Sequence, residues 1–402
     1  MKIAVLGYGT VGSGVVEVLN QNKESIARRA GKEIEVKYVL DLRDFPKDPV
    51  RDILTHDFQD ILNDPEVEIV AEVMGGVKPA YEYVKACLEN GKSVCTSNKE
   101  LVAKHGAQLL EIAKQKKLNF LFEASVGGGI PIIRPLNQSL TADEIMEITG
   151  ILNGTTNYIL SQMHDYGYDF DTVLKEAQRL GYAERNPEAD VEGYDACRKL
   201  AILTSLAYGK QVDFEDIYTE GITKITTEDM KYADALDASI KLLGIGRREN
   251  DKFFAMVAPR IIGKKHPLYS VNNVFNGILV KGNMLGDVMF YGSGAGKLPT
   301  ASAVVADIVD AAKHTGTNIM TLWSSKKLAL STTAEAENVF FVRVPAAEKA
   351  AALETFGDVK EVKAEGVTGE FAFLTKKMTE AAFEESSRRM TVISRIRAEI
   401  EG

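Results

Sequence analysis

The sequence predicts an α/β protein whose first third folds as a parallel sheet covered by helices. Amphipathic stretches at residues 11–19, 80–88 and 99–113 separate short apolar runs and are the expected helices. The runs are apolar at successive positions, so both faces of each strand are expected to be buried, as in parallel sheets. The five runs are KIAVLG, EVKYVL, VEIVAEV, SVCTS and NFLFEA.

From about residue 126 the pattern changes to glycine-rich loops between longer helices and strands, which predicts an α+β domain. A helix expected near residues 299–318 follows the loop GSGAGK, and we expect it to return to the N-terminal domain. The segment 338–402 predicts the order β-α-β-β-α-β, which is ferredoxin-like. The expected domains are therefore 1–128, 129–337 and 338–402.

Composition limits the classes of partner. The 402 residues are too many for one hydrophobic core, so two or three domains are expected. A net charge of −9 disfavours nucleic acid and anionic membranes as partners, and no apolar run approaches the roughly 20 residues that span a bilayer. The cysteines Cys87, Cys95 and Cys197 form no CxxC pair, which favours a reducing, cytoplasmic location.

Gly7, Gly9 and Gly12 form the pattern G-x-G-x-x-G between the first expected strand and the first expected helix. In dinucleotide-binding folds the first glycine allows a tight turn, the second lets the backbone approach the pyrophosphate, and the third lets the helix pack on the strand. The helix N-terminus adds N–H groups and a positive dipole end for phosphates. A tight turn in an unrelated fold is the alternative, but this context favours a Rossmann-type domain.

Two charges at the end of the second expected strand bear on the choice of cofactor. Asp41 would hold the ribose hydroxyls of NAD, whereas Arg43 would hold the additional phosphate of NADP. Each could equally be a solvated loop charge. The sequence therefore leaves NAD and NADP open, with a slight preference for NADP because a guanidinium pairs bidentately with phosphate.

Lys99 follows the SVCTS strand at the carboxyl edge of the sheet, where ligands bind in open α/β folds. From position alone, an ordinary surface lysine is the favoured interpretation, and a ligand-binding lysine is the alternative. Cys95 and His105 nearby are candidates for a nucleophile and a base. The cysteine lies in an apolar strand and the histidine lies within a helix, so packing or surface roles are favoured for both.

An acidic cluster precedes a helix in the middle of the chain. Asp195 and Lys199 are four residues apart and therefore share one face of that helix. One interpretation is a solvated ion pair. The other is a site for a zwitterion, in which carboxylates bind an ammonium group and the lysine donates a proton. Spacing alone leaves both open. The acidic residues before the helix are Glu184, Glu188, Asp190 and Glu192.

Six motifs, taken in order, resemble homoserine dehydrogenase. They cover residues 1 to about 320 without a large gap, and the motif that begins at Leu180 is specific to that family. The resemblance implies reversible hydride transfer between NAD(P)H and L-aspartate 4-semialdehyde, which gives L-homoserine in threonine, methionine and isoleucine biosynthesis. The motifs are VLGYGTVGSGVV, TSNKELVAKHG, FEASVGGGIPII, GILNGTTNYIL, LGYAERNPEADVEGYDACRKLAIL and GAGKLPTASAVVADI.

The resemblance also implies roles for individual residues. Lys199 would be the general acid/base, Asp195 would orient the lysine and the substrate, and Lys99 would lie between cofactor and substrate. Glu184 and Asp190 would receive the ammonium group of the amino-acid substrate. Residues implied for the cofactor are Gly7, Gly9, Thr10, Val11 and Gly12, with Gly294 and Gly296 in a later loop. Residues implied for a monovalent cation, usually sodium, are Glu123 and the carbonyls of Val126, Gly128 and Ile130. The second domain would bind substrate and form a homodimer or a higher homo-oligomer.

Elementary chemistry agrees with these roles and limits the alternatives. Hydride addition to an aldehyde leaves negative charge on oxygen, so a cationic lysine both stabilises the transition state and supplies the proton. A phosphorylating semialdehyde dehydrogenase would need a cysteine paired with a histidine, and neither Cys95 nor Cys197 has a convincing partner in the sequence. A non-catalytic nucleotide sensor with a ligand-binding tail would not need a proton donor.

The tail resembles the ACT regulatory fold, but it departs from the effector-binding pattern. The first loop in feedback-sensitive members of the family typically reads D-x-P-G. Here Ala346 follows Pro345, and no glycine appears before Gly357. A side chain where the backbone must approach a ligand usually blocks that approach. We therefore expect the tail to contribute subunit contacts or stability, and L-threonine to inhibit weakly or not at all. A vestigial domain without a measurable role is the alternative, because fold alone does not fix function.

Overall fold

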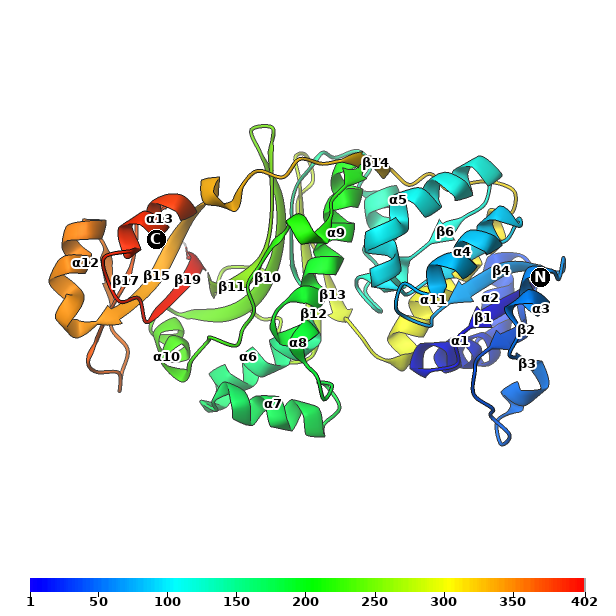
Figure 1. The fold of residues 1–402 in the computed structure, drawn as a ribbon, viewed down its shortest axis with the longest axis horizontal. Helices are drawn as coiled ribbons and strands as arrows, with labels where there is room; N and C mark the ends of the chain where they lie inside the picture. The colour runs from blue at the N-terminus through cyan, green and yellow to red at the C-terminus, as the bar shows by residue number, and fades with distance from the viewer. Residues whose placement is uncertain (401–402) are drawn as a thin grey trace. The chain divides into compact units, whose positions relative to one another are not determined.

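A computed structural model of the chain describes residues 1–400, which form two compact units (Figure 1). The first unit consists of residues 1–144, 201–214 and 292–328, and the second consists of 145–200, 215–291 and 329–400. The helix expected near 299–318 is α11 (Lys297–Lys313), which belongs to the first unit. The units are defined by contacts, so the domain boundaries near 128 and 337 stay a prediction.

The first unit contains a parallel sheet in the order β3-β2-β1-β4-β5-β6, which confirms the predicted sheet. Ile3, Ala4, Val5 and Leu6 of β1 are all fully buried, although they point alternately to opposite faces. This explains why the run shows no polar alternation. The strands are β1 (Lys2–Leu6), β2 (Glu35–Leu40), β3 (Leu54–Thr55), β4 (Val67–Glu72), β5 (Ser93–Thr96) and β6 (Phe120–Leu121), of which β3 was not predicted.

Helices cover both faces of this sheet (Figure 1). On one face, α1, α2 and α11 share a hydrophobic core with β1, β4 and β5, and on the other α4 packs against α5. A Cβ atom at Gly14 would lie 2.9 Å from the Cβ of Ala301, so glycine allows the close approach of α1 to α11. The helices are α1 (Thr10–Gln21), α2 (Lys23–Ala30), α3 (Phe58–Leu62), α4 (Ala80–Glu89) and α5 (Lys99–Lys116). Three of them confirm the predicted helices, whereas α2 and α3 were not predicted.

The second unit is built on a large mixed sheet in the order β13-β12-β7-β10-β11-β19-β15-β17-β16. Its first five strands are β7 (Ile145–Ile151), β10 (Ala238–Glu249), β11 (Lys252–Gly263), β12 (Phe275–Gly282) and β13 (Gly286–Ser293), and β9 (Tyr218–Thr219) pairs with β11. The helices are α6 (Gly154–Tyr166), α7 (Phe170–Arg179), α8 (Glu188–Val191), α9 (Tyr194–Tyr208) and α10 (Thr227–Ala235), and α9 runs on into the first unit. The first unit also contains the short pair β8 (Lys210–Gln211) and β14 (Ser324–Lys327).

The tail follows the predicted β-α-β-β-α-β order with one addition, the two-residue strand β18 before the second helix, and the strand order β19-β15-β17-β16 is that of a ferredoxin-like sheet. The sheet does not stand alone, because β19 pairs in parallel with β11 and extends the large sheet. The tail elements are β15 (Glu337–Pro345), α12 (Lys349–Phe356), β16 (Lys360–Val362), β17 (Glu370–Leu374), β18 (Met378–Thr379), α13 (Glu380–Ser387) and β19 (Ser394–Glu399). Among residues 1–400, no helix is long and apolar enough to cross a membrane.

Candidate active site

The glycine loop between β1 and α1 has the geometry that a phosphate-binding turn needs. Gly7 has a φ of +99°, and a Cβ atom at Gly12 would lie 1.9 Å from the Gly7 carbonyl oxygen. No heavy atom lies within 4 Å of the place that a Gly9 Cβ would take, so the backbone there is open to a ligand. Thr10 and Val11 begin α1, and no side chain caps the helix. Its first N–H groups therefore fit the phosphates of a dinucleotide.

Asp41 and Arg43 form an ion pair beside this loop. Arg43 Nε lies 3.0 Å from Asp41 Oδ1, and its Nη2 donates to the carbonyl oxygen of Tyr8. The Tyr8 N–H donates to the other carboxylate oxygen of Asp41 at 2.8 Å. The Arg43 guanidinium and these N–H groups hold the pKa of the Asp41 carboxyl well below its usual range. Asp41 and Arg43, which the sequence predicts to contact the cofactor ribose or its phosphate, therefore lie together next to the glycine loop.

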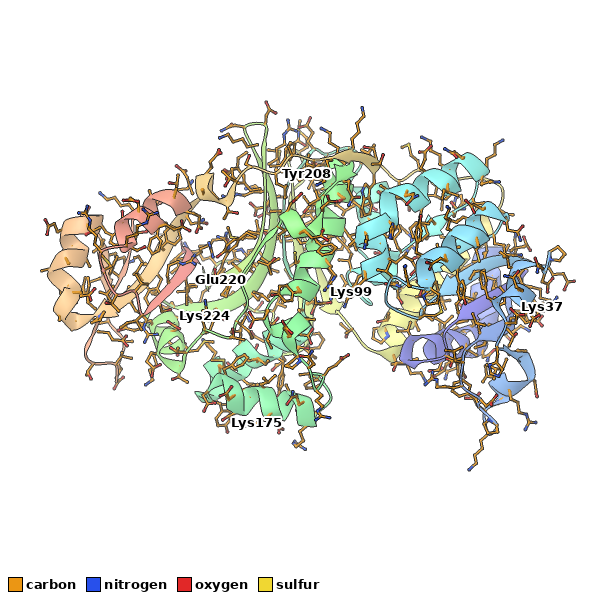
Figure 2. The ribbon with its side chains drawn as sticks, in the orientation of Figure 1. Lys37, Lys99, Lys175, Tyr208, Glu220 and Lys224 are labelled. Carbon is orange, nitrogen blue, oxygen red and sulfur yellow. The ribbon has the colours of Figure 1, made fainter. Side chains whose placement is uncertain are left out.

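Lys99 is the first residue of α5 and is half-buried (Figure 2). Asn98 caps this helix, because its side chain accepts from Leu101 N at 3.1 Å, and its Nδ2 donates to Gly76 O. Glu72, fully buried at the end of β4, accepts from Thr96 Oγ1 at 2.6 Å, and burial raises the pKa of the Glu72 carboxyl. The carboxyl ends of β4 and β5 are therefore linked through polar side chains that sequence analysis missed.

The cysteine and histidine near Lys99 have the inert surroundings that their sequence context predicts. Cys95 is fully buried, and burial raises the pKa of its thiol far above the ordinary value. His105 stacks on Tyr81 with ring centroids 4.1 Å apart, and burial lowers its pKa. Because the thiolate is the reactive form of cysteine, Cys95 is a poor nucleophile.

Glu123 lies in a buried charged group that sequence analysis did not predict. Its two carboxylate oxygens accept N–H bonds from Ile132, Ile133 and Arg134 at 2.6, 2.8 and 2.7 Å, so they cap the helical segment 133–139. The Glu123 N–H donates to the carboxylate of Asp307 on α11, and Arg134 Nη2 lies 2.5 Å from Oδ1 of Asp307. Burial and the nearby charge of Glu123 raise the pKa of Asp307 to about 8, against the lowering effect of Arg134.

The turn after Glu123 is packed against the loop before α11. Gly128 has a φ of +58°, and a Cβ atom there would lie 2.3 Å from the carbonyl oxygen of Gly294. Gly296, the residue before α11, has a φ of +120°. Val126 and Ile130 lie in the same turn and are buried. Carbonyl oxygens such as those of this turn suit a hard monovalent cation, whereas both oxygens of the Glu123 carboxylate already accept backbone N–H bonds.

Asp195 and Lys199 form a buried ion pair on α9. Lys199 Nζ lies 2.8 Å from Asp195 Oδ2 and donates to the Leu152 carbonyl oxygen, also at 2.8 Å. The exposed fractions are 4% for Asp195 and 8% for Lys199, so the pair is not a solvated surface contact. A buried lysine that keeps its charge beside a carboxylate can donate a proton to a developing oxyanion.

Asp190 joins this pair through Asn153, whose Nδ2 donates to Asp190 Oδ1 at 2.7 Å and to Asp195 Oδ2 at 2.9 Å. Glu184 lies on an exposed stretch, where its backbone carbonyl accepts from Gln178. Within residues 1–400, no hydrogen bond ties the Glu184 carboxylate to the group around Lys199. The structure therefore joins Asp190, Asp195 and Lys199 through hydrogen bonds, whereas the exposed Glu184 carboxylate is not hydrogen-bonded to them.

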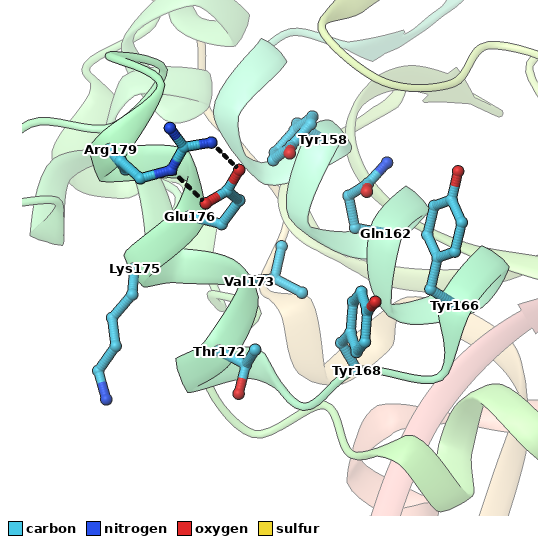
Figure 3. Close-up of a pocket in the computed structure, with 9 residues that line it drawn as sticks. All are labelled: Tyr158, Gln162, Tyr166, Tyr168, Thr172, Val173, Lys175, Glu176 and Arg179. Carbon is cyan, nitrogen blue, oxygen red and sulfur yellow. Dashed lines mark hydrogen bonds and ion pairs between the residues drawn. The ribbon is translucent and has the colours of Figure 1, made fainter.

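A pocket of about 600 Å³ lies elsewhere in the second unit, between α6 and α7 (Figure 3). Tyr158, Tyr166 and Tyr168 line it, together with the exposed ion pair of Glu176 and Arg179. None of the residues that line this pocket belongs to the group around Lys199. Among residues 1–400, no cluster of three or more His, Cys, Asp or Glu side chains could hold a metal ion.

Comparisons with known proteins relate the chain to one family of enzymes. A family model described as homoserine dehydrogenase matches residues 131–309, and one described as the NAD-binding domain of homoserine dehydrogenase matches residues 7–123. A homoserine dehydrogenase from Pseudomonas aeruginosa is 46% identical over 311 residues, which are 77% of this chain and 72% of that protein. One from Synechocystis is 48% identical over 319 residues, covering 77% and 73% of the two chains.

Solved structures extend the likeness to the whole described fold. The structure of a homoserine dehydrogenase from Thiobacillus denitrificans matches with a TM-score of 0.90 and 38% identity, covering 100% of this chain and 99% of that one. A hyperthermophilic archaeal homoserine dehydrogenase in complex with NADPH matches with a TM-score of 0.67 and 28% identity, covering 77% of this chain and 97% of that one.

Proposed function

Because the chain belongs to the homoserine dehydrogenase family, we propose that Lys199 is the group that donates and accepts the proton in its reaction. The enzyme is an NAD(P)-dependent oxidoreductase that interconverts L-homoserine and L-aspartate 4-semialdehyde in amino-acid biosynthesis. The observation that carries the proposal is the buried contact of Lys199 Nζ with Asp195 Oδ2. Neither a non-catalytic sensor nor a phosphorylating dehydrogenase needs this arrangement.

The reaction assigns a separate task to each polar group. A bound nicotinamide supplies or takes the hydride, so the chain has only to bind, orient and move a proton. Lys199 protonates the substrate oxygen during reduction and removes the proton during oxidation. Asp195 keeps the ammonium group of Lys199 charged and orients it toward the substrate. Asp190 receives the ammonium group of the substrate, with Glu184 as a second carboxylate. Lys99 is the second proposed catalytic residue and would lie between the bound cofactor and the substrate.

NADP is the proposed cofactor. Gly7, Gly9, Thr10, Val11 and Gly12 would hold the pyrophosphate, and Gly294 and Gly296 would approach the cofactor from the later loop. Arg43 supports the choice of NADP, because its guanidinium already neutralises the Asp41 carboxylate that would repel a ribose phosphate. An exposed arginine can also turn to pair bidentately with that phosphate.

A monovalent cation, sodium by preference, is proposed for the turn that follows Glu123. The carbonyl oxygens of Val126, Gly128 and Ile130 are ligands of the kind that such an ion takes. The Glu123 carboxylate accepts N–H bonds from residues 132–134, and its Oε2, which accepts only one of them, is the proposed side-chain ligand. The cation has a structural role here and no step of the reaction depends on it.

The proposed assembly is a homodimer or a higher homo-oligomer that works in the cytoplasm. The experiment that tests the function is an assay of the purified chain with L-homoserine and with NAD or NADP, followed by the absorbance of the reduced nicotinamide. Turnover that requires L-homoserine and a nicotinamide cofactor is expected, with NADP used better than NAD. Cofactor binding without any turnover would favour the sensor instead.

A further inference from the structure

The turn between β7 and α6 contacts both members of the Asp195–Lys199 pair. β7 ends at Ile151, and the next two residues are Leu152 and Asn153. The carbonyl oxygen of Leu152 accepts from Lys199 Nζ at 2.8 Å, while Asn153 Nδ2 donates to Asp195 Oδ2 at 2.9 Å. Two successive backbone positions therefore hold the proposed proton donor and the carboxylate beside it.

Contacts at both ends of the Asn153 amide fix its orientation. Its Oδ1 accepts the Thr156 N–H at 2.9 Å and so caps the N-terminus of α6. The opposite end of the amide then faces the acidic residues and donates to Asp190 and Asp195. An amide nitrogen carries two N–H donors, so each carboxylate receives one. Asn153 is 6% exposed, which limits competition from water for these bonds.

The side chain of Leu152 packs against two glycines of the large sheet. Gly150 of β7 and Gly244 of β10 face each other in the sheet. A Cβ atom at Gly150 would lie 2.7 Å from Leu152 Cδ2, and one at Gly244 would lie 3.0 Å from Leu152 Cδ1. Both glycines therefore leave room for the Leu152 side chain, and this fixes where its carbonyl oxygen meets Lys199.

We propose that Asn153 is a positioning residue, which holds the carboxylates of Asp190 and Asp195 in one fixed arrangement around Lys199. The proposal rests on the proposed function, because it gives these three residues their roles in the reaction. It adds a physical link between them: one amide joins the carboxylate that receives the substrate ammonium group to the carboxylate that orients the lysine. Loss of Nδ2 therefore disturbs substrate binding and proton transfer together.

The variant Asn153→Ser separates this role from helix capping. Serine keeps an oxygen that can cap α6 but has no counterpart of Nδ2. We expect kcat/KM for L-homoserine to fall about 10- to 100-fold, with a higher KM and a lower kcat, because bonds to charged groups are lost. The acid limb of the pH profile should move to higher pH, because carboxylates that lose a donor are protonated more easily. Cofactor affinity, measured by fluorescence titration, should not change.

One control matches this variant, and a second test variant, Gly244→Ala, has its own control in Gly263→Ala. Asp169→Ala removes the N-cap of α7, whose side chain accepts from Thr172 N, without touching the carboxylates, so it should lower stability and leave the kinetics unchanged. Gly244→Ala should lower kcat more than it changes KM, because the added Cβ displaces Leu152. Gly263→Ala, where an added Cβ would meet only Ile400 Cγ2 at 3.9 Å, should have little effect.

The outcomes separate this proposal from the proposed function. If the wild-type enzyme oxidises L-homoserine, Lys199→Ala is inactive and Asn153→Ser keeps wild-type kcat, KM and pH profile, the positioning role is overturned and the function stands. The same holds if Asn153→Ser lowers stability alone, as Asp169→Ala does. If the wild-type enzyme has no activity with L-homoserine, both proposals are overturned.

Discussion

Arg343 Nη1 lies 2.7 Å from Asp229 Oδ1 and joins the first strand of the tail to the capping box of α10. Arg343 is 2% exposed, and its Nε and Nη2 each lie 2.9 Å from a carboxylate oxygen of Glu370. Together with the pairing of β19 and β11, this contact makes the tail an integral part of the sheet of the second unit.

The tail should therefore act as a structural support. We expect L-threonine to inhibit weakly or not at all, because Ala346 stands where an effector loop of the ACT-like kind would have glycine. Activity measured across a range of L-threonine concentrations checks this. Inhibition at submillimolar L-threonine that disappears on truncation before Asn338 would refute it.

Replacing Arg343 by methionine should destabilise the protein by about 3–5 kcal/mol, because the change leaves the carboxylates of Asp229 and Glu370 without their buried partner. Thermal unfolding of Arg343→Met measures the loss. Lys349→Met, which removes an exposed pair with Glu361, is the matched control and should change stability by less than about 1 kcal/mol. Equal losses in the two variants would contradict the support role.

Arg43→Ala should weaken the binding of NADP more than that of NAD, because only NADP has a ribose phosphate for the guanidinium to pair with. Dissociation constants for both cofactors, measured on the same preparations, check this prediction. An equal loss for NAD and NADP, or a strong native preference for NAD, would argue against the assignment. Arg51→Ala, which changes an exposed arginine in the same unit, is a control for loss of surface charge.

Glu123→Ala should lower stability by about 3 kcal/mol, because three backbone N–H groups lose a charged acceptor. The sequence alone predicts that this loss responds to sodium or potassium, whereas the capping contacts predict that it is the same in sodium and in choline chloride. The thermal midpoint in each salt decides between them. Activity of the wild-type enzyme should depend on sodium if the carbonyl turn holds the ion. Activity that is the same with and without sodium or potassium would contradict the proposed cation site.

The dependence of stability on pH should carry a contribution from Asp307. Its pKa is raised to about 8 in the folded protein, so above its ordinary value of 3.8 the folded state binds a proton that the unfolded state has lost. Stability from this group therefore falls as the pH rises from about 4 to about 8, by at most about 1.4 kcal/mol per unit. Asp307→Asn should flatten this part of the curve. A variant that follows the wild-type slope would show that Asp307 is ionised throughout.

The local sequence pattern was enough to predict the parallel sheet and one part of the candidate site, the contact of Asp195 with Lys199. Runs such as KIAVLG are apolar at every position because both faces of the strand are buried, and Asp195 and Lys199 meet because four residues make about one helical turn. A signal of this kind lies within a few neighbouring residues and needs no tertiary contact.

The remaining contacts join residues that are far apart in sequence. Asn153 reaches Asp190 and Asp195 across 37 and 42 residues, and Arg134 meets Asp307 across 173. An asparagine before a helix indicates an N-cap, but nothing local indicates that the other end of its amide binds two carboxylates. In the same way, nothing local indicates that the Glu123 carboxylate accepts three N–H bonds where the chain folds back at residues 132–134.

The central claim is that Lys199 moves the proton in the reaction. The measurement that tests it most directly compares kcat for L-homoserine oxidation in the wild type, in Lys199→Ala and in Lys175→Ala, which changes an exposed lysine of α7. We predict that Lys199→Ala lowers kcat by about 100-fold or more, with cofactor affinity unchanged, while Lys175→Ala behaves as the wild type. Near-complete turnover by Lys199→Ala would contradict the account.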